Sequence, residues 1–231
     1  MDSSPKPTLH REIVDALGRD IVSGELPAGQ RFTIDELQQR YGASRTVIRD
    51  VVQVLQSLRL LAVKRRVGLI VEEPSAWSVF DPQIIAWRLE TRDRARYFSE
   101  LTALRIAVEP IAAAAAARNM SAAERENLLT LEAKMRTLGE AGKLDEFLIA
   151  DQQFHAAILS GSQNSLFASL CEVIGEVLAE RTRQGLMPRK PEPEALSGHN
   201  AVAHHIAHGD APAAEAAMHG ILLEVREAMG W

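Results

Sequence analysis

Apolar and polar positions near the N-terminus follow the period of an α-helix. Apolar residues recur every three or four positions over residues 9–22 and predict an amphipathic helix that ends at Ser23-Gly24. Thr33, followed three residues later by Glu36, predicts a capping box at the start of a second, shorter helix. The chain is therefore expected to begin with two helices separated by a turn.

A third helix and a β-hairpin follow. Ser44 predicts a helix cap, and the apolar positions between residues 47 and 58 form the buried face of that helix. Two short β-prone runs, at 61–63 and 69–71, are joined by a basic segment, which predicts a hairpin with a charged tip. Three helices and a two-stranded wing in this order describe a winged helix-turn-helix.

The pattern changes at Glu72-Glu73-Pro74-Ser75, which gives the best domain boundary. We expect a winged helix-turn-helix domain at 1–73, a linker with a first connecting helix at 74–93, and a second domain at 94–231. No β-prone run occurs after the boundary. The helices expected there are 81–92, 94–118, 121–138, 143–159, 164–183, 194–208 and 210–229. The fold class is therefore mainly α, with an antiparallel helical bundle behind the winged domain.

Composition is that of a globular protein, with 46% hydrophobic and 25% charged residues. The single cysteine, Cys171, excludes an internal disulfide and favours a reducing cytoplasm. Residues 1–7 are expected to form a disordered leader rather than a signal peptide. The longest apolar stretch, residues 111–117, is far too short for a membrane span.

Charge is distributed unevenly along the chain. The net charge of −5 argues by itself against a nucleic-acid partner, but residues 1–72 carry 11 Lys and Arg against 9 Asp and Glu. Within 40–66 there are seven basic residues and one acidic residue, Asp50. A basic patch inside an acidic chain is what a DNA-facing surface requires.

The start of the third helix carries side chains suited to DNA. Gly42 supplies the turn, Ser44 and Thr46 can bind phosphate, and Arg45 and Arg49 lie four residues apart on one face. Arg can pair bidentately with guanine in the major groove. The hairpin tip adds Lys64, Arg65 and Arg66. The alternative is a solvated charged face, but turn, cap, paired arginines and basic wing in one order favour DNA binding.

A second group of residues has the spacing of a metal site. Asp151 and His155 lie at i and i+4 on one helix face, and His199 and His219 lie on later helices. Histidine with a carboxylate suits Zn²⁺ or a similar divalent ion. From the residues alone, a buried histidine bonded to a neighbouring carboxylate explains the pattern equally well, and it is the simpler interpretation.

Residues 9–72 resemble the N-terminal domain of GntR-type transcription regulators. The resemblance rests on Ile21-Val22-Ser23-Gly24-Glu25-Leu26, Pro27-Ala28-Gly29, Glu36-Leu37, Gly42-Ala43-Ser44-Arg45-Thr46, Ile48-Arg49-Asp50 and Gly68. It implies that Ser44, Arg45, Thr46, Arg49 and the wing tip contact operator DNA. Arg59 departs from the pattern, because many relatives have glycine there.

Residues 95–225 resemble the helical FCD effector domain of the FadR branch of that family. The resemblance rests on Leu104-Arg105-Ile106-Ala107-Val108-Glu109-Pro110, Asp151-Gln152-Gln153-Phe154-His155, His199, and the segments 206–210 and 213–218. It implies a divalent ion, most simply Zn²⁺, held by Asp151, His155 and His199. A fourth histidine is usual at the position of Ile221. His219 lies about 200° round the helix from that position and is expected to point away.

The same resemblance implies a small carboxylic acid as effector. Arg105 corresponds to an arginine that holds a carboxylate in the family, and Glu109 and Arg183 are further candidates for the pocket. The alternative for Arg105 is an ion pair with Glu109. Residues 77–90 resemble the galactonate-operon repressor group, which implies an aldonate-like acid. Alternatively, or in addition, Trp77, Phe80 and Trp87 join the two domains.

Together these patterns predict a cytoplasmic homodimeric repressor that leaves its operator when a sugar acid binds. A metal-dependent hydrolase, in which Asp151, His155 and His199 hold a water nucleophile, is the alternative. No well-placed general base supports it, although Glu109 can be argued.

Overall fold

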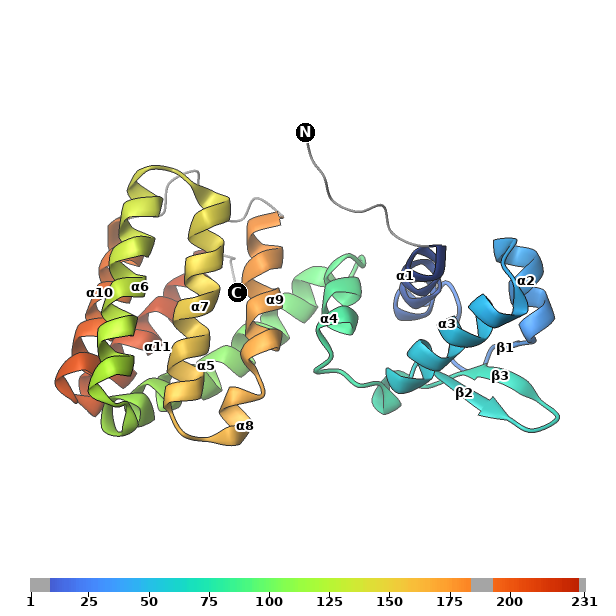
Figure 1. The fold of residues 1–231 in the computed structure, drawn as a ribbon, viewed down its shortest axis with the longest axis horizontal. Coiled ribbons are helices and arrows are strands. Elements are labelled where there is room, and N and C mark those ends of the chain that lie inside the picture. Colours follow the sequence, from blue (N-terminus) through green and yellow to red (C-terminus); the bar gives the residue numbers. More distant parts are fainter. Residues whose placement is uncertain (1–8, 184–192, 229–231) are drawn as a thin grey trace. The chain divides into compact units, whose positions relative to one another are not determined.

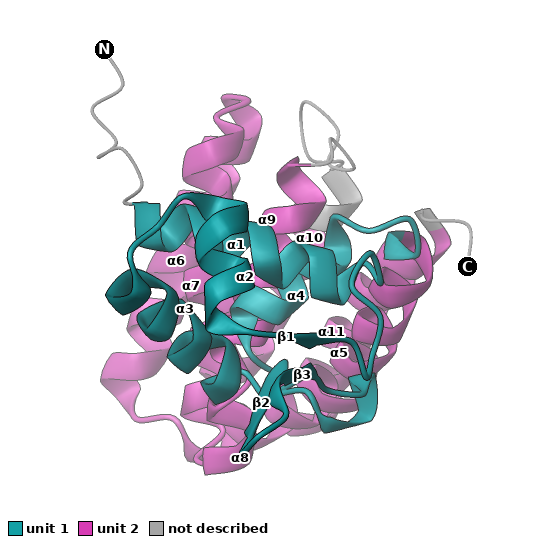
Figure 2. Ribbon diagram, turned by 90° about the vertical axis from the view of Figure 1, so that its right-hand side faces the viewer, with its two compact units in different colours: residues 1–94 teal, residues 95–231 magenta. Residues whose placement is uncertain are grey.

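The computed structural model describes residues 9–183 and 193–228, and the predicted leader at 1–7 lies outside them (Figure 1). The chain divides into two compact units, residues 1–94 and 95–231 (Figure 2). Each unit has its own hydrophobic core. No helix of the described residues is both long and apolar enough to cross a membrane.

The N-terminal unit contains helices and a small sheet, as the sequence predicts. In chain order its elements are α1 (Leu9–Val22), β1 (Arg31–Phe32), α2 (Ile34–Tyr41), α3 (Arg45–Ser57), β2 (Leu61–Lys64), β3 (Gly68–Val71), the 3₁₀ turn η1 (Pro74–Ala76) and α4 (Pro82–Leu89). Its core is built by the apolar faces of α1 and α3 together with Leu37, Leu60 and Leu69. This confirms the predicted winged helix-turn-helix.

The predicted caps set the start of α2 and α3. Thr33 Oγ1 accepts from the backbone N–H of Glu36 (3.1 Å), and the Glu36 carboxylate accepts from the N–H of Thr33 (2.6 Å). Gly42 ends α2 in the left-handed conformation, at φ 62°. Ser44 Oγ then accepts from the N–H of Val47 (3.3 Å) and begins α3. The turn between the two helices is therefore fixed by local chemistry.

The wing is one strand wider than predicted. The sheet has the order β1-β3-β2, with both pairs antiparallel. β1 pairs Arg31 with Ile70 and Phe32 with Leu69. A two-residue strand is too short to leave an alternating pattern in the sequence, so only its pairing in the fold reveals it. Gly68 is required here, because a Cβ at this residue would lie 2.6 Å from the carbonyl oxygen of Phe32.

The helix expected in the linker, α4, packs on the N-terminal unit. The indole of Trp87 lies against Gly18 of α1, Gln83 Nε2 donates to Asp15 (2.9 Å), and Arg19 pairs with Glu90 (2.6 Å). Of the three aromatic side chains expected to join the domains, Trp77 and Trp87 lie in the core of this unit, whereas Phe80 is exposed.

Arg59 adopts the conformation that glycine favours. Its φ is 60°, and its N–H donates to the carbonyl of Gln56 (2.9 Å) just beyond α3. The exit from the recognition helix thus keeps a left-handed residue even though the side chain is arginine. For a residue with a Cβ this conformation costs roughly 1–2 kcal/mol.

The second unit is helical throughout its described residues. Its helices are α5 (Arg94–Asn119), α6 (Ala122–Glu140), α7 (Leu144–Gly161), α8 (Ser165–Ala168), α9 (Cys171–Arg183), α10 (Pro193–His208) and α11 (Ala211–Ala228). α6 packs on α7 and α10, α7 on α9, and α10 on α11. The helix predicted at 164–183 is in fact two helices, because the chain turns after Ala168, where the Ser169 hydroxyl donates to the carbonyl of Leu166 (2.8 Å).

Candidate nucleic-acid interface and metal centre

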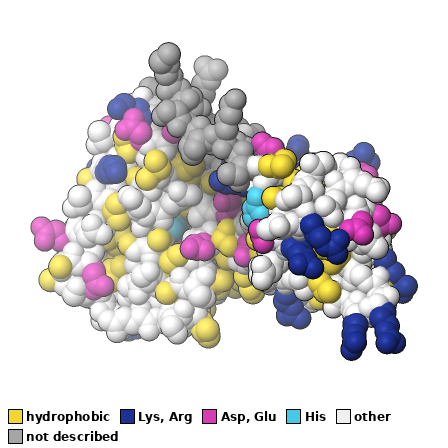
Figure 3. Space-filling view, turned by 45° about the vertical axis from the view of Figure 1, so that its right-hand side comes forward, with side chains coloured by type: hydrophobic (Ala, Val, Ile, Leu, Met, Phe, Trp, Pro, Cys, Tyr) yellow, Lys and Arg dark blue, Asp and Glu magenta, His cyan; other side chains and the backbone are white. Residues whose placement is uncertain are grey.

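The predicted DNA-binding residues of α3 are at the surface. Ser44, Arg45, Thr46 and Arg49 are all exposed, and the Ser44 hydroxyl also caps the helix. Figure 3 shows Lys and Arg side chains gathered over the N-terminal unit, with one pair projecting at the lower right. The helix N-terminus and the two arginines present positive charge to the same side, which suits an anionic polymer.

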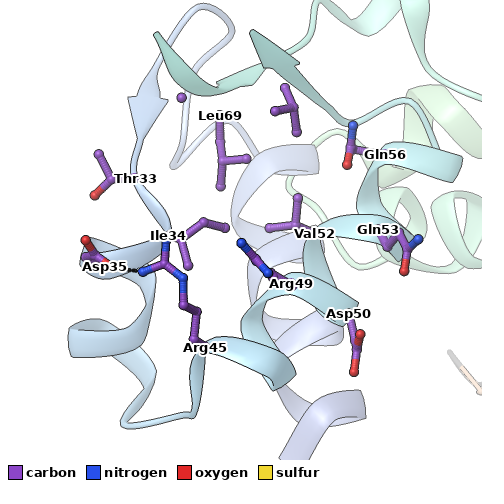
Figure 4. Close-up of a pocket in the computed structure, with 12 residues that line it drawn as sticks. Thr33, Ile34, Asp35, Arg45, Arg49, Asp50, Val52, Gln53, Gln56 and Leu69 are labelled. Carbon is purple, nitrogen blue, oxygen red and sulfur yellow. Dashed lines mark hydrogen bonds and ion pairs between the residues drawn. The ribbon is translucent and has the colours of Figure 1, made fainter. Parts of the chain in front are cut away.

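A groove of about 620 Å³ separates the start of α3 from the sheet. Arg45 and Arg49 line it from α3, and Val63, Gly68 and Leu69 line it from the strands (Figure 4). Asp35, from the first turn of α2, also lines this groove. The Arg45 guanidinium donates to the Asp35 carboxylate at 2.7 Å (Figure 4). Sequence analysis missed Asp35, because the pairing joins two different helices.

The wing tip presents the remaining predicted cations. Lys64, Arg65 and Arg66 are all exposed. Arg66 has a left-handed backbone, with φ 66°, and the N–H of Val67 donates to the carbonyl of Lys64 (3.0 Å). This tight turn holds the three basic side chains together at the end of the hairpin, where they can reach phosphate or a groove.

In the second unit, the three predicted metal ligands come together in the core. Asp151 and His155 lie on consecutive turns of α7, and His199 lies on α10; all three are buried. Asp151 Oδ1 lies 3.4 Å from His155 Nε2 and 3.3 Å from His199 Nε2. One potential ligand atom from each of the three residues falls within 4.8 Å of the other two.

Glu109 of α5 orients His155. Its carboxylate hydrogen-bonds His155 Nδ1 and accepts from Arg105 Nε (2.5 Å), and all three side chains are buried. When Nδ1 donates to a carboxylate, the lone pair of Nε2 is available for a cation. The ion pair between Arg105 and Glu109, the alternative weighed for Arg105, is thus present in the structure.

Paired charges shift the pKa values in this cluster. Burial alone would raise the pKa of Glu109, but Arg105 and then His155 lower it to about 2. Burial alone would lower the pKa of His155, but Glu109 and Asp151 raise it to about 9. Burial would raise the pKa of Asp151, but His155 and His199 hold it well below its usual range. The carboxylates are therefore ionised at neutral pH, whereas His155 is protonated, so an ion that binds its Nε2 must displace a proton.

The geometry of Asp151, His155 and His199 fits a small divalent cation. Asp151 Oδ1 is buried and accepts no well-formed hydrogen bond from the described residues. Two donor atoms bound tetrahedrally to one ion at about 2.1 Å lie about 3.4 Å apart. The two separations from Asp151 match that edge. The cluster can therefore hold a metal ion.

The sequence did not single out Arg181, an arginine of α9 close to this cluster. Burial lowers the pKa of Arg181 on α9, Asp151 opposes this effect electrostatically, and Arg105 reinforces it. The Arg181 guanidinium therefore lies near the acidic cluster. Arg183, the residue named from the sequence, is half-exposed and pairs with Glu176 and with Glu180 (2.9 Å). The two residues lie about 200° apart round the helix, so only one can face α7.

Comparison with known proteins decides the family. The model of bacterial regulatory proteins of the gntR family matches residues 9–71, and the FCD domain model matches residues 100–224. The chain belongs to the GntR family of transcription regulators and carries an FCD domain, as in the FadR subfamily.

Several known proteins are similar to this chain over most of its length. The galactonate operon transcriptional repressor of Escherichia coli K12 is 30% identical over 210 residues, covering 89% of this chain and 90% of that protein. The regulator LutR of Bacillus subtilis 168 is 26% identical, covering 90% and 95%. A solved GntR protein of Streptococcus agalactiae shares the fold, with a TM-score of 0.54 at 23% identity, covering 94% and 99%.

Membership in the GntR family excludes the alternative of an enzyme, because these proteins are transcription regulators without catalytic activity. The chain is therefore not a metal-dependent hydrolase.

Ile221 and His219 are the two residues of α11 that bear on a fourth ligand. Ile221 is buried, and a Cβ on Gly198 would lie 2.8 Å from its Cγ1, so Ile221 packs against the residue that precedes His199. His219 is exposed, in agreement with its expected outward direction.

Proposed function

We propose that this GntR regulator is a cytoplasmic, homodimeric repressor of sugar-acid catabolism genes that a metal-dependent acid effector releases from its operator. The buried cluster of Asp151, His155 and His199 carries the proposal. It lies in the FCD domain of a chain that is 30% identical to a galactonate operon repressor. An aldonate is the acid this relationship suggests.

The proposed DNA contacts are those of α3 and the wing. Arg45 and Arg49 enter the major groove, Ser44 and Thr46 bind phosphate, and the three wing cations contact the adjacent backbone or groove. The exposure of all of these side chains supports this assignment. In a dimer, two such units bind half-sites one helical turn apart, on a palindromic operator.

The proposed effector site is built around Asp151, His155 and His199, which hold a divalent ion such as Zn²⁺. The ion supplies a positive centre for the acid's carboxylate. Arg181 lies close enough to interact with Asp151, and no hydrogen bond or ion pair holds it among the described residues, so its planar fork is available to the acid. Arg105 and Glu109 act at the same site by orienting His155.

Release requires that the acid bind the DNA-incompetent state more tightly than the DNA-bound state, since equal affinity for both states would shift nothing. Two measurements test this mechanism. The first is binding of acids to the metal-loaded and the metal-stripped protein. The second is the effect of the same acids on a protein–DNA complex.

The first test is calorimetry of hexonates and hexuronates, galactonate first, against both forms of the protein. We expect heat of binding from the metal-loaded form only. His199→Ala should abolish both metal retention and acid binding. His219→Ala is the matched control, because it removes an exposed histidine of the same unit and should change neither. Absence of heat from every acid in both forms would contradict the proposed pocket.

The second test is a mobility shift on duplexes that the protein itself selects from a random-sequence library. We expect Arg45→Ala to lose the selected duplex at moderate salt. We expect the acid that gives heat to release wild-type protein from it. An acid that binds but leaves the complex intact would contradict release, and a wild-type protein that selects no sequence would contradict the assigned DNA contacts.

A further inference from the structure

An acidic side chain lies on the surface that faces DNA. Asp35 is 72% exposed and lines the same groove as Arg45 and Arg49. Figure 4 shows its carboxylate directed at the Arg45 guanidinium, between the start of α2 and the start of α3. A carboxylate at this place repels the phosphate backbone, so it lowers the affinity of the surface for any DNA sequence.

The carboxylate is held in place from both helices. Arg45 Nη1 donates to Asp35 Oδ1 at 2.7 Å. In the amide orientation that satisfies both of its neighbours, Gln38 donates to the same Asp35 oxygen (3.2 Å) and accepts from the backbone N–H of Arg45 (3.0 Å). Asp35 and Gln38 of α2 thus form a small network around the first residue of α3.

Stability alone does not explain this network. Arg45 is 55% exposed and Asp35 is 72% exposed, and ion pairs this open to solvent typically contribute about 0–1 kcal/mol. The network does have a geometric effect. The guanidinium is planar and rigid, so a fixed contact at Nη1 restricts the direction of the whole fork. Reading guanine requires that two donors of the fork meet O6 and N7 together.

We propose that Asp35 is a specificity-determining residue, which orients Arg45 for base reading and reduces binding to non-cognate DNA. Arg45 is then the base-reading arginine of α3. Arg49, which has no hydrogen bond or ion pair within the described part of the chain, enters the same groove without such orientation. The inference rests on the DNA contacts proposed above, but it concerns selectivity and not binding as such.

The test compares two substitutions that remove the same charge. Asp50 lies on α3 and lines the same groove, but Figure 4 shows its carboxylate directed away from both arginines. Asp35→Asn and Asp50→Asn should therefore raise the affinity for random duplex to a similar extent, because each removes one negative charge near phosphate. Only Asp35→Asn should lower the ratio of selected-duplex to random-duplex affinity, by about tenfold.

The base position at which selectivity is lost tests whether Asp35 acts through Arg45. In the sequences that Asp35→Asn selects, the base preference at one position of each half-site should weaken, and Arg45→Lys should weaken the base preference at the same position. The double variant should lose no more selectivity than Arg45→Lys alone, since the two residues act through one contact. The proposal would be overturned if Asp35→Asn and Asp50→Asn had equal ratios of selected-duplex to random-duplex affinity. It would also be overturned if Asp35→Asn weakened the base preference at a position that Arg45→Lys leaves unchanged. If wild type selects no sequence, the DNA contacts themselves fail, and this outcome is distinct from the other two.

Discussion

The contact between Gly18 and Trp87 offers a sharp test of how α4 is attached. A Cβ added to Gly18 would lie 2.3, 2.4 and 2.7 Å from three atoms of the Trp87 ring. Carbon atoms in contact are normally about 3.5–4.0 Å apart, so the ring would have to move by more than about 1 Å. Trp87 is only 2% exposed and sits in the core of the N-terminal unit, so it has little room to do so.

The expected magnitude follows from two opposing effects of Gly18→Ala. Replacing glycine by alanine inside a helix stabilises it by about 1 kcal/mol. Overpacking a filled core costs about 1–3 kcal/mol, and occasionally more when the obstructing group is rigid. Since a buried indole is rigid and three of its atoms are involved, we expect an overpacking cost near the upper end, about 3 kcal/mol, and after the helix gain of about 1 kcal/mol the N-terminal unit should lose about 2 kcal/mol in free energy of unfolding. This corresponds to a Tm lower by roughly 8–16 °C for a unit of this size.

The assay is differential scanning calorimetry, with the two units treated as separate transitions. Gly220→Ala is the matched control, because Gly220 is also helical and a Cβ there meets nothing within 4 Å. This control should leave the Tm of the N-terminal unit unchanged and should leave the Tm of the second unit unchanged or raise it slightly. An N-terminal transition that Gly18→Ala leaves unchanged or raises would refute the packing of α4 on α1.

Three further predictions concern single residues. Arg59→Gly should raise the free energy of unfolding of the N-terminal unit by about 1 kcal/mol in urea titration, because the φ of 60° strains any residue with a Cβ; no gain would argue against the left-handed exit from α3. Glu109→Gln should weaken metal binding by about 10- to 100-fold in competition with a chromogenic chelator, because His155 loses the carboxylate that orients its ring; unchanged affinity would show that Glu109 does not position the ligand. Hydrogen bonds from the Ser121 side chain and backbone lower the pKa of Glu124. The stabilisation by this capping box is therefore fully present above the ordinary carboxyl pKa, and it is lost as the pH falls through the lowered pKa. Thermal melting of Glu124→Gln should accordingly depend less on pH between about 5 and 3 than that of wild type, and equal slopes would contradict the assigned cap.

Features set by neighbouring residues could be predicted before the fold was known. The capping box at Thr33, the left-handed turn at Gly42 and the cap at Ser44 each depend on atoms within a few positions, and the structure confirms all three. The spacing of Asp151 and His155 likewise places both on one face of α7. These features need only the geometry of one helix or one turn.

Features that depend on contacts between elements were missed or left undecided. The strand at 31–32 exists because β3 lies beside it. Asp35 reaches Arg45 from another helix. The choice between Arg181 and Arg183 depends on which side of α9 faces α7, and no local pattern specifies this.

The sequence alone therefore determined most of the helices, the caps of α2 and α3, the basic wing and the family, because these follow from short-range periodicity and from motifs that stand together in the chain. Only the tertiary structure decided which charged groups meet. It brought Glu109, His155, Asp151 and His199 into one buried cluster from three different helices, and it placed a carboxylate beside the first arginine of α3. Such encounters depend on how helices pack, which is a property of the whole core.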